Sequence, residues 1–161
     1  MIFVSVGTFI QGYDELVSAM DDACAKIGLH AFAQIGNSVV IPRHMEYARF
    51  LTASEMEVRM QQAQLVVCHG GFGIIGDAMR AQKPIIVVPR LTIKTSSSSP
   101  SNNQLLMSLR LKQLYGINVC EKISQLQETL LATIGSSPQL HEYDLTCNIP
   151  RIISDYLKHQ K

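Results

Sequence analysis

Four glycines gather where an apolar run of the sequence gives way to a helical pattern. They are Gly70, Gly71, Gly73 and Gly76. A helix that begins after a glycine-rich turn presents unpaired backbone N–H groups and the positive end of its dipole, and both attract phosphate or diphosphate. The first hypothesis is therefore an anionic ligand at this turn, with a nucleotide as the leading candidate.

Two other interpretations of the glycine cluster stay open. A turn that needs positive φ, or a helix that packs closely on a sheet, also selects glycine without any ligand. Dinucleotide binding is the weaker interpretation. GGFGIIG is not the G-x-G-x-x-G pattern that follows the first strand of a unit with an acidic residue about 20 residues later.

Residues 65–90 have the pattern that would position such a turn. An apolar run, the glycines, about ten residues at helical spacing and a second apolar run predict strand, loop, helix and strand. That order is one right-handed βαβ unit of a parallel sheet.

The rest of the chain continues this alternation. Apolar runs predict strands at residues 2–6, 31–35, 47–51, 85–88 and 117–120. Helical spacing predicts helices at residues 14–27, 52–62, 123–134 and about 150–159, and another that residues 102–104 introduce and Gly116 ends, with a connector at about 135–149. Thr52 and Glu55 have the spacing of a capping box, which fixes the start of the second of these helices.

Apolar side chains at helical spacing are expected to face the core. In two helices the expected buried residues are Leu105, Leu106, Leu109, Leu111 and Leu114, and then Leu126, Leu130, Leu131 and Ile134.

The alternation predicts an α/β fold, a Rossmann-like doubly wound sheet of about five or six mostly parallel strands, in a single domain of 161 residues. Ligands bind such sheets outside the carboxyl ends of the strands. Three loops follow predicted strands: Gly7 with Thr8, residues 69–73 and residues 89–104. We expect them to converge on one crevice.

Composition and charge exclude several classes of function. Lys and Arg number 14 against 13 Asp and Glu, and a net charge of +1 offers no electrostatic footprint for nucleic acid. No stretch approaches the roughly 20 apolar residues of a membrane span, and the N-terminus has the pattern of a strand rather than a signal peptide. Cys24, Cys68, Cys120 and Cys147 include no CxxC pair, as expected in a reducing cytoplasm.

Four motifs in order resemble a known family. The motifs are GTFIQGYDELV, AFAQIGNS, HGGFGIIGDAMRAQKPIIVVPR and, after it, NNQ. They resemble the small catalytic subunit of two-subunit bacterial exopolysaccharide glycosyltransferases, a subunit of the glycosyltransferase family 28 C-terminal domain type. They are similar, more distantly, to the catalytic subunit of the eukaryotic dolichol-linked N-acetylglucosamine transferase and to the C-terminal half of the peptidoglycan N-acetylglucosaminyltransferase. The similarity runs from Phe3 to about Leu130.

The resemblance implies the donor-binding half of a GT-B glycosyltransferase, inverting and independent of a metal or other cofactor. Its donor would be a UDP-sugar. Its acceptor, a lipid-diphosphate-linked saccharide, would be held by a separate membrane-anchored subunit. The chain is then expected at the inner face of the plasma membrane, attached through that partner.

The resemblance also implies roles for single residues. Asp77 matches a Glu that accepts hydrogen bonds from the ribose hydroxyls of UDP, although an Asp in a first helical turn would also complement the helix dipole. The amides of Gly70, Gly71 and Gly73 would approach the diphosphate, and Gly7 and Thr8 would line the facing side.

Four more residues are candidates at the rim of the crevice. Asn103 and Gln104 match a polar pair that reaches donor-sugar hydroxyls, although one of them is equally a helix cap. Arg90 would donate to the phosphates or lie on the surface. His69 would polarise a phosphate or sugar oxygen, or be satisfied by loop backbone, and the general base is expected in the partner.

Two departures from the family pattern favour a second hypothesis. Phe9 stands where relatives carry a histidine, and residues 95–99 lack the acid and histidine found there in relatives. A non-catalytic, degenerate donor domain that stabilises or regulates its partner would tolerate both losses. A third hypothesis is an unrelated oxidoreductase or phosphosugar-binding domain on the same kind of sheet.

Overall fold

The computed structural model describes residues 1–90, 104–135 and 143, and within them six parallel strands form one sheet. The strands are β1 (Ile2–Ser5), β2 (Ala31–Gln34), β3 (Glu46–Ala48), β4 (Leu65–His69), β5 (Ile85–Val88) and β6 (Asn118–Val119). Their order across the sheet is β3-β2-β1-β4-β5-β6, so the chain starts in the middle and winds outward in both directions. This is the doubly wound topology that the alternating pattern predicts.

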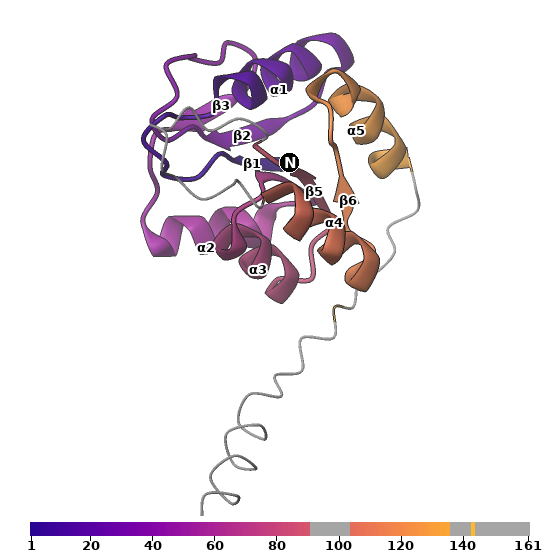
Figure 1. Cartoon of the computed structure of the whole chain (residues 1–161). Helices are drawn as coiled ribbons and strands as arrows, with labels where there is room; N and C mark the ends of the chain where they lie inside the picture. The colour runs from indigo at the N-terminus through magenta and orange to yellow at the C-terminus, as the bar shows by residue number, and fades with distance from the viewer. Residues whose placement is uncertain (91–103, 136–142, 144–161) are drawn as a thin grey trace, which may run out of the picture.

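Helices cover both faces of this sheet (Figure 1). They are α1 (Asp14–Ile27), α2 (Ala53–Gln62), α3 (Phe72–Arg80), α4 (Gln104–Tyr115) and α5 (Leu126–Gly135), with a 3-10 turn, η1, at Ile123–Gln125. Figure 1 shows α1 and α5 on one face and α2, α3 and α4 on the other. The sheet is therefore buried on both sides, which is why its central strands are apolar runs rather than alternating patterns.

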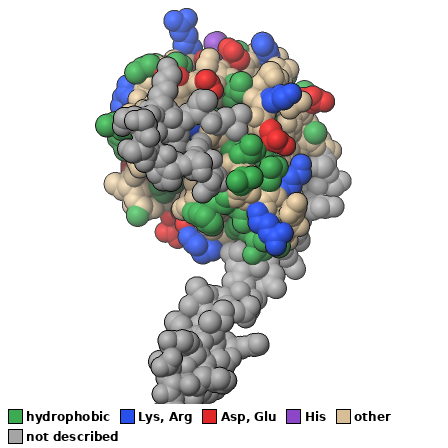
Figure 2. Space-filling model, in the orientation of Figure 1, with side chains coloured by type: hydrophobic (Ala, Val, Ile, Leu, Met, Phe, Trp, Pro, Cys, Tyr) green, Lys and Arg blue, Asp and Glu red, His purple; other side chains and the backbone are tan. Residues whose placement is uncertain are grey.

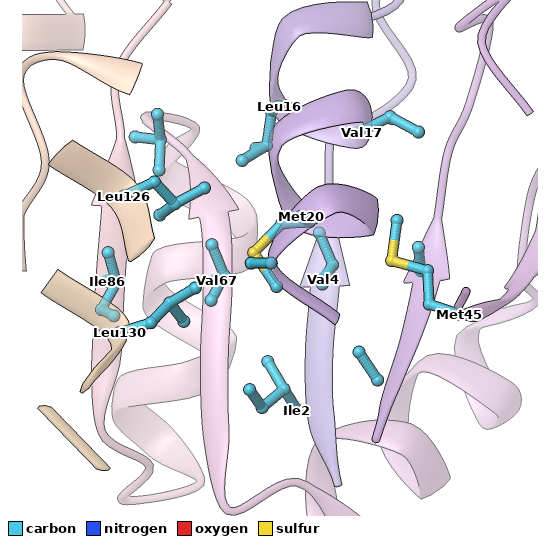
Figure 3. Packing of buried hydrophobic residues seen from close by; sticks show 14 of the residues in the cluster. Ile2, Val4, Leu16, Val17, Met20, Met45, Val67, Ile86, Leu126 and Leu130 are labelled. Atoms are coloured by element: carbon cyan, nitrogen blue, oxygen red, sulfur yellow. The ribbon is translucent and has the colours of Figure 1, made fainter. Parts of the chain in front are cut away.

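The core consists of one apolar cluster on each face of the sheet. Leu16 and Met20 of α1 and Leu130 of α5 pack on β1 and β4 in the first cluster (Figure 3). Phe3, Met60 and Ile75 belong to the second cluster, under α2 and α3. Side chains of one strand alternate between the faces of the sheet, so β1, β2, β4 and β5 each contribute to both clusters.

Two predicted helix boundaries are confirmed. Thr52 and Glu55 form the full capping box, with the Thr52 hydroxyl accepting from the Glu55 amide and the Glu55 carboxylate accepting from the Thr52 amide at 2.7 Å. Gly28 ends α1 in the left-handed region at φ 65°, where a side chain would be strained.

The predicted third strand is placed wrongly. Residues 47–51 were expected to be extended, but β3 is Glu46–Ala48 and pairs with β2 from Phe32 to Gln34. The register of β2 with β3 ends at the pair of Gln34 and Ala48, and the last backbone bond between the two segments is from the Gly36 amide to the Arg49 carbonyl. Phe50 and Leu51 are then free to form part of a loop at the carboxyl edge of the sheet.

The expected buried faces of α4 and α5 are partly wrong. Leu106 and Leu114 are 69% and 55% exposed, and Leu131 and Ile134 are 50% and 48% exposed. Figure 2 shows hydrophobic side chains on the surface where α4 lies. The buried stripe of α4 runs instead through Ser108, with Met107, Leu111 and Tyr115 partly buried around it. A small polar residue at the centre of a contact gives no hydrophobic signal in a sequence.

Several expectations lie outside the described residues. They are Asn103, residues 91–101 of the predicted loop, the predicted connector beyond Gly135 except for Tyr143, and the helix at about 150–159. Tyr143 packs edge-on against Tyr115, and its hydroxyl donates to the Lys83 carbonyl at 3.1 Å. Within the described ranges no helix is both long and apolar enough to cross a bilayer.

Candidate functional site

A cavity of about 290 Å³ opens at the carboxyl ends of β1, β2 and β4. We call it the site cavity. It is lined by Ser5, Gly7, Thr8, Gln34, Phe50, Leu51, Met56, His69, Gly71, Gly73, Ile74 and Asp77. Six of the predicted site residues therefore lie around one opening, and they come from loops that are far apart in the sequence.

The first turn of α3 faces this cavity with unused backbone donors. Gly71 is the N-cap residue and its lack of a side chain leaves the helix without a side-chain cap. The first helical bond is from the Ile75 amide to the Gly71 carbonyl at 3.2 Å. Within the described part of the chain, the amides of Phe72, Gly73 and Ile74 donate no hydrogen bond. Such a helix start suits an anion.

The glycines of the cluster serve different purposes. A Cβ on Gly73 would meet no atom within 4 Å, so this position faces open space. A Cβ on Gly70 would lie 2.8 Å from Cβ of Gln104, so Gly70 is needed for the close packing of α4. A Cβ on Gly71 would lie 2.3 Å from Nε2 of His69. The packing interpretation is therefore correct for Gly70 and Gly71, while Gly73 remains available to a ligand.

His69 is held between two loops. Cβ atoms on Gly7 and on Gly71 would both lie within 2.5 Å of its imidazole, so the ring occupies the space that these two glycines leave. Nδ1 of His69 donates to the Ser5 carbonyl across a long 3.4 Å contact, and because a carbonyl only accepts, the proton is assigned to Nδ1. Burial and, to a smaller extent, the Arg90 charge lower the pKa of His69 below its ordinary 6.5, against the opposing effect of the Ser5 carbonyl.

Asp77 lies in the second turn of α3, not in the first. No acidic residue lies in the first turn, so the interpretation of Asp77 as a dipole-complementing cap is wrong. Its Oδ1 accepts a hydrogen bond from Nη2 of Arg80, and the Asp77 side chain is 49% exposed. Asp77 also lines a second cavity of about 450 Å³ between α2 and α3. Among the described residues around the site cavity, Asp77 carries the one charged side chain.

Arg90 is not a surface residue and does not line the site cavity. It is 6% exposed, its guanidinium donates to the Gly12 and Val6 carbonyls, and it stacks on the Tyr13 ring at 4.5 Å. It lines instead a cavity of about 680 Å³ near the start of α1. Arg90 therefore braces the loop between β1 and α1 from within.

Gln104 lies at the first turn of α4, beside Gly70 and Arg90. Its Oε1 accepts from the Arg90 amide at 3.0 Å and its carbonyl accepts from the Ser108 hydroxyl at 2.6 Å. Its predicted partner in sequence, Asn103, is outside the described residues. The role of this pair toward a donor sugar stays a prediction.

Sequence reasoning missed half of the cavity lining. The missed residues are Ser5, Gln34, Phe50, Leu51, Met56 and Ile74. Ser5 and Gln34 did carry a signal, because each is a polar residue at the end of an apolar strand. Phe50 and Leu51 were hidden by the wrong bounds of the third strand.

Among the described residues, no group of three or more His, Cys, Asp or Glu side chains is placed to hold a metal ion. The polar groups at the site cavity are the α3 amides, the Asp77 carboxylate, the His69 imidazole and the side chains of Ser5, Thr8 and Gln34.

Known structures share this fold at low sequence identity. The glycotransferase of kitacinnamycin superposes with a TM-score of 0.65 at 19% identity, over 88% of this chain and 36% of that one. The calicheamicin glycosyltransferase CalG4 superposes with a TM-score of 0.65 at 16% identity, over 98% of this chain and 42% of that one. MurG of Acinetobacter baumannii superposes with a TM-score of 0.63 at 13% identity, over 97% of this chain and 49% of that one. This chain thus spans less than half the length of each.

The described fold is accordingly that of the C-terminal half of GT-B glycosyltransferases. No curated protein matches the chain. The family model of the glycosyltransferase family 28 C-terminal domain, however, matches residues 1–146, which include every element of the sheet and the whole site cavity. The chain therefore belongs to the glycosyltransferase family 28 C-terminal domain family.

Proposed function

We propose that this chain binds a UDP-sugar in the site cavity and, together with a membrane-anchored acceptor-binding subunit, transfers the sugar to a lipid-diphosphate-linked saccharide in bacterial surface polysaccharide synthesis. The observation that carries the proposal is the convergence of the α3 amides, Asp77 and the Gly7–Thr8 loop on one opening. Two of the structural neighbours, VinC and SpnG, were solved with thymidine diphosphate bound.

The spacing along α3 fits a nucleoside diphosphate. Gly73 and Asp77 are four residues apart, which is about 6 Å along a helix axis. The unused amides of Phe72, Gly73 and Ile74 would hold the diphosphate, and the Asp77 carboxylate would accept from the ribose hydroxyls further along. Because the Asp77 carboxylate repels phosphate, this orientation of the ligand matches the charges around the site cavity.

The same amides would stabilise the leaving group. Cleavage of the sugar–phosphate bond develops charge on the diphosphate, and fixed N–H dipoles at a helix start oppose that charge in place of a metal ion. Inversion at the sugar carbon then follows from direct attack by the acceptor hydroxyl on the face opposite the diphosphate.

His69 would act as an acceptor rather than as a cation. Its Nδ1 proton is directed at the Ser5 carbonyl, so in the neutral ring Nε2 carries a lone pair. Such a nitrogen accepts a hydrogen bond from a sugar hydroxyl but does not polarise a phosphate oxygen. We propose the hydroxyl role, with the base for the acceptor supplied by the partner subunit.

The competing proposal is a non-catalytic donor domain that stabilises its partner. Phe9 favours it, since Phe9 replaces a histidine of the relatives and lies over the Arg90 guanidinium at 5.4 Å. Both proposals include nucleotide binding, so turnover separates them.

A carboxylate placed at the start of α3 should weaken nucleotide binding without loss of stability. In Gly73→Glu the side chain enters open space, favours the positive end of the helix and occupies the place of the diphosphate. We expect UDP affinity by calorimetry to fall roughly tenfold or more, and less in the neutral Gly73→Gln. Gly135→Glu is the matched control, because Gly135 also faces open space but lies at the end of α5. Equal UDP binding by Gly73→Glu and wild type would contradict the site.

Removal of the Asp77 carboxylate should abolish the preference for a ribose over a 2′-deoxyribose nucleotide. Wild type is expected to bind UDP about tenfold more tightly than 2′-deoxy-UDP, because a hydrogen bond to a charged group is lost with the hydroxyl. Asp77→Ala should bind both equally. Its stability should change by less than about 0.5 kcal/mol, since the Asp77–Arg80 pair is exposed. An unchanged preference in Asp77→Ala would remove Asp77 from the ribose site.

Turnover should depend on the partner. Release of UDP from a panel of UDP-sugars is measured for the chain alone and for the chain co-expressed with the neighbouring reading frame, with Asp77→Ala as the inactive control. We expect release in the complex with one sugar and little in the chain alone. A complex that binds UDP but releases none from any sugar would establish the non-catalytic alternative.

The stability of the chain should rise with pH as His69 loses its proton. Because its folded pKa lies below 6.5, the unfolded chain binds more protons in the window between the two values. The free energy of unfolding should therefore increase with pH up to about 6.5 and level off above it. Asp21 and Glu55, whose folded pKa values are also lowered, add to the rise at lower pH. In denaturant titrations the slope just below pH 6.5 should therefore be smaller in His69→Gln than in wild type. Titration of the His69 ring by NMR at or above 6.5 would contradict it.

A further inference from the structure

Gln34 is a polar side chain buried at the end of β2. It is 4% exposed, and its neighbour across the sheet in register is Ser5, which is 2% exposed. Both line the site cavity. Burial of an amide is unfavourable unless its hydrogen bonds are made, so the contacts of Gln34 indicate why it is there.

Both the nitrogen and the oxygen of the Gln34 side-chain amide make hydrogen bonds. Nε2 donates to the Gly7 carbonyl at 3.1 Å and to the Arg49 carbonyl at 3.0 Å. Oε1 accepts from the Ser5 hydroxyl at 2.9 Å. Two carbonyls can only accept, so the orientation of the amide is fixed by its partners. The reversed amide would place Oε1 against both carbonyls.

The two carbonyls belong to two different loops of the site cavity. Gly7 precedes Thr8 in the loop after β1, and Arg49 precedes Phe50 and Leu51 in the loop after β3. These loops have no secondary structure to hold them. Gln34, on the strand between β1 and β3 in the sheet, connects both.

The backbone around this connection is in close contact. Gly36 has φ 53°, and a Cβ there would lie 2.3 Å from the Gly7 carbonyl oxygen. The Gly36 amide donates to the Arg49 carbonyl at 2.7 Å, next to the bond from Gln34. Ser5, which donates to Gln34, also provides the carbonyl that orients His69.

We propose that Gln34 is a positioning residue that holds the Gly7–Thr8 loop and the Arg49–Leu51 loop in the arrangement that binds the donor nucleotide. The proposal rests on the proposed function of the site cavity. Loops fixed before the ligand arrives need not be ordered on binding, which raises affinity. Gln34 itself contacts the two loops and acts through them.

A merely structural role would predict a different result. If Gln34 only stabilised the sheet, its loss would weaken β1, β2 and β4 together. If it positions the loops, its loss changes residues 6–10 and 49–52 and leaves the central strand β4 unchanged. Amide hydrogen exchange measured by mass spectrometry distinguishes the two.

The test compares three full-length variants. Gln34→Glu has the same shape but places an oxygen against two carbonyls, and Gln34→Met removes all three bonds without that repulsion. Asn37→Ala is the matched variant, because exposed Asn37 donates to the Thr8 and Phe9 carbonyls at 3.2 Å and makes no bond to the Arg49 loop. If Gln34→Glu does not fold, Gln34→Met decides.

We expect the rate of amide hydrogen exchange at residues 6–10 and 49–52 to rise roughly tenfold in the Gln34 variants. In Asn37→Ala the rate should rise only at residues 6–10. UDP affinity should fall roughly tenfold in the Gln34 variants, with unchanged exchange across Leu65–His69. Unchanged exchange at residues 49–52, or faster exchange spread evenly through β4, would overturn the proposal. If wild type binds no UDP, the proposed function fails, while the exchange result still decides whether Gln34 holds the loops.

Discussion

The structure depends on the close approach of three loops at the carboxyl edge of a parallel sheet. A Cβ on Gly7 would lie 2.5 Å from the His69 ring, and a Cβ on Gly36 would lie 2.3 Å from the Gly7 carbonyl oxygen. A Cβ on Gly71 would lie 2.3 Å from the same His69 ring. No side chain fits at that distance. Glycine at these three positions lets the loops after β1, β2 and β4 meet, and the site cavity is the space that their meeting encloses.

This contact determines how charge is distributed. Arg90 is buried against the loop after β1 and gives its hydrogen bonds to the Gly12 and Val6 carbonyls. A phosphate-binding role would need that guanidinium at the opening, where the described lining holds one charged side chain, Asp77. Within the described lining the positive potential comes from the amides of α3, while Arg80 beside the cavity is paired with Asp77. Under the proposed function, an anion would therefore be held near Gly73 and away from the carboxylate.

The elements could be predicted from the sequence because buried parallel strands are apolar runs and their helices carry clear end signals, as at Thr52 and Gly28. The convergence of the Gly-rich turn and the Gly7–Thr8 loop on one crevice could be predicted from topology, whereas Asp77 was expected there only from the family resemblance. Arg90 could not be placed, because a sequence does not tell whether an arginine after a strand turns inward to backbone carbonyls. Leu106 and Ser108 show the same limit. Periodicity predicts that a helix forms here, but not which of its faces packs on the sheet. That orientation depends on Gly70, because the lack of a side chain there lets α4 pack closely.

The departure at Phe9 can be interpreted within this geometry. Phe9 is 39% exposed and lies over Arg90, whereas its neighbour Thr8 lines the site cavity. A histidine at this position would therefore lie beside the site cavity and not among the residues that line it. The substitution leaves the α3 amides, Asp77 and His69 in place, so under the proposed function it would affect what approaches the site cavity from outside. A division of donor binding and acceptor chemistry between two subunits, as proposed above, would fit that arrangement.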